Sequence, residues 1–116
     1  MYRYLRWRSI LRTRGRAGLP RFLIERAFEV GQDRMPEIGR RSRSIIEGQM
    51  PEVTWLHSHV TVDDDGRVRT FCVYEAPDEE AVREHSRRLG EHSLAGIHEI
   101  AGDVTPEDLP LAEEPV

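Results

Sequence analysis

The sequence predicts an α+β fold whose elements follow in the order strand, helix, strand, strand, helix, strand. An Asp-Gly step lies between two runs rich in Val, Thr and aromatic residues within 55–77, which is a strong signal of a β-hairpin. Two segments, 33–48 and 78–90, carry apolar residues at spacings of three and four, as amphipathic helices do. Shorter β-rich runs at 21–29 and 96–104 add one strand before the first helix and one after the second.

The first strand begins at Arg21 and continues through the segment FLIERAFE. The helix that follows has Pro36 in its first turn, where proline is tolerated, and it is ended by Gly48 and Pro51. Its inner face is predicted from residues at helical spacing: Met35, Ile38, Ser42, Ile45 and Ile46.

The hairpin segment, WLHSHVTVDDDGRVRTFCVYEAP, sets which side chains share a face of the sheet. A two-residue loop at Asp65-Gly66 places one set on one face: Trp55, His57, His59, Cys72 and Tyr74. The other face then carries Leu56, Val60, Val62, Phe71 and Val73. A four-residue loop keeps these faces, whereas a three-residue loop places the histidines beside Phe71 and Val73.

The second helix, DEEAVREHSRRLG, has acids in its first turn, arginines in its last turn and Gly90 as its stop. Val82, His85 and Leu89 share its inner stripe, so His85 is expected to point toward the sheet as a packed, hydrogen-bonded residue. The last strand is predicted in GIHEIAGDV. The complete order is that of the ferredoxin-like split βαβ unit, an antiparallel sheet with both helices on one face.

The uncovered sheet face would hold aromatic and histidine side chains, so we expect a second copy of the chain to cover it. Two sheets packed face to face make a dimeric α+β barrel, and Trp55 is the expected anchor of this homodimer.

Length and charge predict a single domain at 21–104. Residues 1–20 hold six of the 17 arginines and no acid, which leaves 11 basic against 21 acidic residues in the rest of the chain. We expect 1–20 to be a disordered basic extension and 105–116 a disordered acidic tail. The acidic body argues against nucleic acid as a partner, the short apolar runs argue against a membrane span, and the single Cys72 fits a cytoplasmic protein.

The pattern His57-Ser58-His59 predicts a candidate metal site. Alternate residues of a strand lie on one face about 6.6 Å apart at Cα, a span that two imidazoles can close over one ion. Cys72 is the expected third ligand, and imidazole with thiolate suits nickel, zinc or copper. Asp63, Glu25 or Glu75 could also contribute.

Two other hypotheses come from different classes. The lumen of the barrel could bind a small molecule or act as a cofactor-independent oxygenase, with His57 or His59 as base and Tyr74 as an orienting hydroxyl. Alternatively, the histidines and Cys72 could line the interface of a dimer with a purely structural role.

The segments WLHSHVT, FCVYEAPDEEAVREHSRRLG and IHEI resemble a small bacterial family catalogued as a domain of unknown function, numbered forty-two forty-two. One branch of that family consists of nickel-binding, nickel-responsive dimeric proteins with a ferredoxin-like fold. The resemblance covers residues 21–104 and implies the same fold, a homodimer and nickel as the candidate metal. It implies no enzymatic reaction, so a non-catalytic metal-binding protein is the expected function.

Overall fold

The computed structural model describes residues 18–109. Residues 18–100 belong to one structural unit, and 101–109 are the described part of a second. In chain order the first unit contains β1 (Arg21–Phe28), the 3-10 helix η2 (Gln32–Arg34), α2 (Met35–Gln49), β2 (Thr54–Val62), β3 (Val68–Glu75), α3 (Glu79–Leu89) and β4 (His92–Glu99). The predicted order of strands and helices is therefore confirmed.

The second unit contains one described element, the 3-10 helix η3 (Pro106–Asp108). Most of the predicted N-terminal extension and all of 110–116 lie outside the described residues, so the predictions of disorder there stay predictions. Among the described helices, none is long and apolar enough to cross a membrane.

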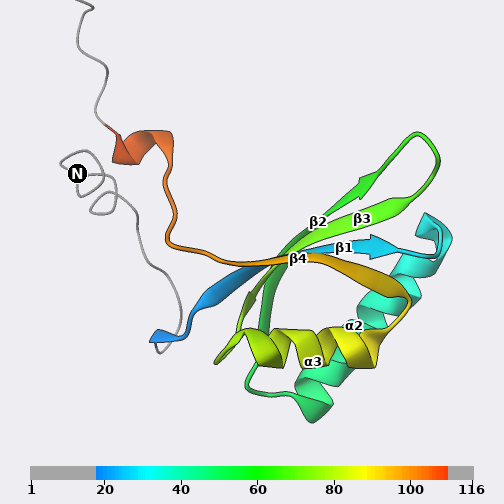
Figure 1. Ribbon diagram of the computed structural model, residues 1–116, viewed down its shortest axis with the longest axis horizontal. Coiled ribbons are helices and arrows are strands. Elements are labelled where there is room, and N and C mark those ends of the chain that lie inside the picture. The colour runs from blue at the N-terminus through cyan, green and yellow to red at the C-terminus, as the bar shows by residue number, and fades with distance from the viewer. Residues whose placement is uncertain (1–17, 110–116) are drawn as a thin grey trace, which may run out of the picture. The chain divides into compact units, whose positions relative to one another are not determined.

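The four strands form one antiparallel sheet in the order β2-β3-β1-β4, and both helices lie on the same side of it (Figure 1). This is the ferredoxin-like arrangement that the sequence predicted. The core between the helices and the sheet is built from alternate strand residues and from the inner helix faces. Its buried apolar members include Phe22, Ile24, Ile38, Ile46, Val82 and Leu89.

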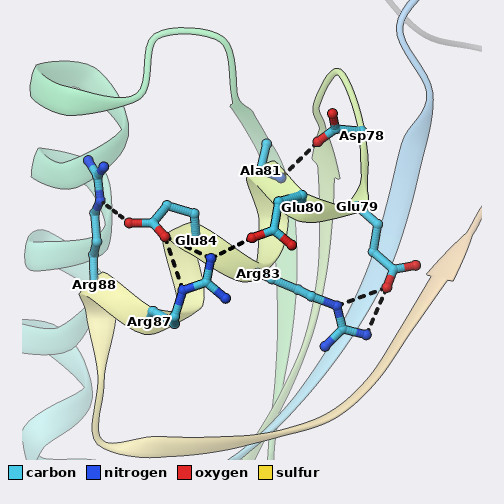
Figure 2. Close-up of polar contacts among 8 residues, drawn as sticks. All are labelled: Asp78, Glu79, Glu80, Ala81, Arg83, Glu84, Arg87 and Arg88. Carbon is cyan, nitrogen blue, oxygen red and sulfur yellow. Dashed lines mark hydrogen bonds and ion pairs between the residues drawn. The ribbon is translucent and has the colours of Figure 1, made fainter.

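Helix α3 is stabilised by charges placed as the sequence predicted. Asp78 is its N-cap, and the Asp78 carboxylate accepts a hydrogen bond from the backbone N–H of Ala81 at 2.9 Å. Along its outer face, Glu84 binds Arg87 and Arg88, and Arg87 also reaches Glu80 (Figure 2). These ion pairs are exposed and each contributes little, whereas the N-cap is worth about 1 kcal/mol.

Strand β4 begins four residues earlier than the sequence predicted. Gly90 ends α3 with φ of 71°, and Glu91 follows with φ of 61°, so the chain turns directly into β4 at His92 without a loop. Positive φ is unusual for a residue with a Cβ atom. The Glu91 carboxylate is held by ion pairs to Arg34 and Arg41, which anchor this turn to α2 and to the segment before it.

The hairpin between β2 and β3 has a three-residue loop, so the two-residue loop and its assignment of faces are wrong. Val62 pairs with Val68, and the Asp63 N–H donates to the Arg67 carbonyl at 3.0 Å, which leaves residues 64–66 as the loop. Gly66 has φ of 82°, as the left-handed position of such loops requires. The Asp63 carboxylate also accepts hydrogen bonds from the backbone N–H groups of Asp65 and Arg67.

A β-bulge at Leu56 completes the register. Trp55 pairs with Tyr74, and the next paired residue of β2 is His57, opposite Val73. An extra residue in one strand moves the chain before it to the opposite face. Trp55 therefore shares the helix-covered side with Tyr74, whereas His57 and His59 lie on the open side beside Val73 and Phe71.

Candidate metal site and buried polar cluster

His57 and His59 are neighbours on the open face of the sheet. Both are exposed, and their ring centroids lie 5.5 Å apart with the ring planes at 78°. Because β2 is an edge strand, one side of this pair is not covered by another strand of the sheet. Two accessible imidazoles therefore converge on one small patch of surface.

The carboxylates predicted as further ligands do not complete this pair. Glu25 is on the open face but binds Arg69, with 2.6 Å between Oε2 and Nη1. Asp63 is engaged with the backbone of the hairpin loop, and Glu75 is buried at the far end of β3. Within residues 18–109, no three His, Cys, Asp or Glu side chains are grouped closely enough to hold a metal ion.

Cys72 lies on the opposite side of the sheet from the two histidines. It pairs with Ser58 and is only 4% exposed, and its sulfur accepts a hydrogen bond from Arg26 Nη1 at 3.4 Å. The three-residue loop is the reason, because it moves β3 by one position relative to the two-residue-loop register, in which Cys72 pairs with His59; Cys72 pairs with Ser58 instead. In the folded chain Cys72 and the histidines are therefore not brought together.

Tyr74 and Trp55 share that helix-covered side, so they too are absent from the open face. The rings of Trp55 and Tyr74 pack at 6.3 Å between centroids, and Trp55 Nε1 donates to Ser58 Oγ at 2.8 Å. The pairing of a histidine base with the Tyr74 hydroxyl, expected for an enzymatic lumen, is thus not formed. The expectation that Trp55 anchors an open-face dimer is also wrong.

A second group of polar side chains lies beneath the helices, around Arg26. Arg26 comes from the middle of β1 and is only 1% exposed. Its guanidinium donates to Ser86 Oγ, Cys72 Sγ, the Tyr74 hydroxyl and His85 Nδ1, at 3.2 to 3.5 Å. We call Arg26, Ser42, Cys72, Tyr74, His85 and Ser86 the buried polar cluster.

The hydrogen bonds of the buried polar cluster determine the tautomer of His85. A guanidinium can only donate, so His85 Nδ1 accepts from Arg26, and the ring proton lies on Nε2, which donates to Ser42 Oγ at 3.1 Å. Burial and the nearby Arg26 charge lower the pKa of His85 to about 4. Burial likewise raises the pKa of Tyr74. Both side chains are therefore neutral near neutral pH.

The inward position of His85 was predicted from helical spacing and is confirmed, whereas Arg26 was missed. A signal for Arg26 exists in the sequence. Arg26 alternates along the strand with Phe22, Ile24 and Phe28, so strand periodicity alone places Arg26 on the buried face.

Residues 22–100 match the model of the family described as Nickel responsive protein SCO4226-like. The chain belongs to this family. The matched region runs from β1 to the end of β4, and so contains both the histidine pair and the buried polar cluster. It agrees with the nickel-related resemblance found in the sequence. The comparisons with curated proteins and with solved structures give no match.

Proposed function

We propose that this protein is a non-catalytic nickel-binding protein that holds the ion through His57 and His59 on the open face of the sheet. The observation that carries the proposal is the pairing of two exposed imidazoles on one strand in a member of a nickel-responsive family. A nickel-responsive protein requires an accessible set of nitrogen, sulfur or oxygen ligands. The exposed pair His57 and His59 is such an accessible set of nitrogen ligands.

The ligand chemistry suits nickel. Imidazole nitrogen binds nickel, copper and zinc well, and the intrinsic order of affinities places copper above nickel. Two imidazoles from one chain leave further coordination positions for water or for side chains of a second chain. Nickel bound only by these two imidazoles would dissociate rapidly into solvent unless a second chain covers the pair.

A homodimer through the open face is the second part of the proposal. Leu23 and Phe71 are half-buried on this face, and Val73, the cross-strand partner of Leu23, is only 7% exposed. Two sheets of this kind can pack face to face, and in a twofold dimer both chains contribute the same patch. Such a dimer places both histidine pairs in one interface and gives the nickel site ligands that a single chain lacks.

Calorimetric titration of tag-free protein with nickel tests this site. The parent is expected to bind nickel, and the double variant His57→Ala/His59→Ala is expected to lose most of the affinity because both imidazoles are removed. His92→Gln is the control, since His92 lies on the helix-covered side beside Phe28. Equal nickel affinity in the parent and the double variant would show that this pair is not the site.

Acidification gives a second readout in the same titration. Imidazole binds metal only when it is unprotonated, so protons compete with nickel for the site. Nickel affinity is therefore expected to fall between pH 7.5 and pH 5.5 in the parent. A pH-independent affinity would point to a different ligand type.

A further inference from the structure

We propose that the cavity between α2 and the strands β1, β2 and β3 binds a small carboxylate, held by the charge of Arg26 and the hydroxyl of Thr70. This site lies on the helix-covered side of the sheet, opposite His57 and His59, and is independent of nickel binding. It gives the buried polar cluster a ligand.

The cavity has a volume of about 130 Å³. Its wall is mostly apolar, and the lining residues that carry polar groups are Arg26, Ser42, Ser58, Thr70, Cys72 and Tyr74. An engineered protein cavity of about 150 Å³ holds benzene, so this one suits a ligand of about six non-hydrogen atoms. Val60 of the edge strand β2 is among its lining residues and is 56% exposed, so this side of the cavity is open to solvent.

The first argument for an anion is the charge of Arg26. Its hydrogen-bond partners are hydroxyls, a thiol and a neutral imidazole, and none of the partners in the described part of the chain is acidic. Burying a cation without an opposite charge is costly, and the cost amounts to several kcal/mol even after the structure relaxes. An anion in the adjoining cavity would offset this cost of burying the Arg26 charge.

The second argument is a hydroxyl that lacks a partner. Thr70 is 4% exposed and lines the cavity, and its Oγ1 makes no hydrogen bond within residues 18–109. Thr70 is also the residue of β3 that pairs with Arg26 of β1. A buried hydroxyl without a partner costs about 1 to 3 kcal/mol, so a ligand that accepts its proton would remove this cost.

A second hydroxyl donor, besides that of Thr70, follows from the hydrogen bonds of Ser42. Ser42 Oγ accepts the His85 Nε2 proton and lies 3.4 Å from the Tyr74 hydroxyl, which also accepts from Arg26. Ser42 and Tyr74 each carry one hydroxyl proton, but only one of the two can lie between their oxygens. The other is left as a donor, and Ser42 and Tyr74 both line the cavity together with Thr70 and Arg26.

The rest of the lining selects the class of anion. Phe28, Ile38 and Leu89 give the cavity apolar walls that phosphate or sulfate would not fill favourably. A short-chain carboxylate matches both parts of the cavity, because its head accepts hydrogen bonds beside a cation and its tail is apolar.

Calorimetric titration with butyrate and with butyramide tests the proposal. The two molecules have nearly the same shape and differ in charge, so butyrate is expected to bind at least tenfold more tightly. Thr70→Val keeps the shape of the side chain and removes the hydroxyl. It is expected to weaken butyrate binding about three- to tenfold while raising the thermal midpoint of the free protein, because the unpartnered polar group is gone.

A matched pair of glycine variants in α2 tests the location. Gly39 lines the cavity and has open space where a Cβ atom would be added, so Gly39→Leu is expected to fill the cavity and abolish butyrate binding. Gly48 lies on the exposed side of the same helix, and Gly48→Leu is expected to bind as the parent does. The proposal is overturned if the parent does not bind butyrate, if butyramide binds equally well, or if Gly39→Leu binds undiminished.

Discussion

His85 makes the stability of the molecule depend on pH. The side chain is fully buried and neutral, with a pKa of about 4 in the folded protein against 6.5 in its ordinary state. Above pH 6.5 His85 is unprotonated in both the folded and the unfolded chain, so burial of the neutral ring costs the protein no stability through proton binding. Between pH 6.5 and pH 4 only the unfolded chain takes up the proton, and the free energy of unfolding is expected to fall by about 3 kcal/mol.

Urea unfolding of the parent and of His85→Gln at a series of pH values measures this effect. The variant has no imidazole at this position, so its stability should change much less between pH 6.5 and pH 4. A smaller dependence in the same direction remains from His92, whose pKa is also lowered by burial. Parallel pH profiles for parent and variant would contradict the role given to His85.

At the scale of single elements, the hairpin marks the limit of what the sequence could predict. Local patterns were sufficient for the order of elements, for both helices and for the inward position of His85. The Asp65-Gly66 step, however, suits both a two-residue loop and a three-residue loop with glycine in the left-handed position. The Asp63 carboxylate favours the longer loop by accepting hydrogen bonds from two backbone N–H groups, and the longer loop pairs Cys72 with Ser58 instead of His59.

The bulge at Leu56 had no signal in the sequence, because neither Gly nor Pro marks it. It turns Trp55 under the helices, where the ring packs on Tyr74. Tertiary packing of a large aromatic therefore decided the start of β2. Strand alternation alone could not show this.

Alanine substitution at Gly66 tests the hairpin geometry, and Gly39 in α2 provides the comparison. Gly66 has positive φ, so Gly66→Ala is expected to destabilise the protein by about 1 kcal/mol. Gly39 lies within α2 with open space around its Cα, so Gly39→Ala is expected to stabilise it by about 0.5 to 1 kcal/mol. Thermal unfolding measures both. A neutral Gly66→Ala would indicate a loop without a left-handed residue.

At the scale of the whole molecule, the open sheet face is where we expect two copies to meet. Phe71 lies there between His59 and Glu25, and Phe71→Glu is expected to convert the dimer to a monomer by placing a charge in the interface. Val62→Glu is the control, because Val62 is an exposed apolar residue on the other side of the same sheet. Light scattering at tens of micromolar gives the masses. A monomeric parent would contradict the dimer.

The most direct test of nickel binding by His57 and His59 is a nitrogen-15 NMR titration of tag-free, metal-free protein with nickel. Signals of nuclei close to a bound nickel ion broaden or shift first. We predict that the backbone signals of 57–59 change first, together with those of the facing Phe71 and Val73, and that these changes are lost in His57→Ala/His59→Ala. Changes that begin around other residues, or that persist unaltered in the double variant, would contradict a nickel site at this histidine pair.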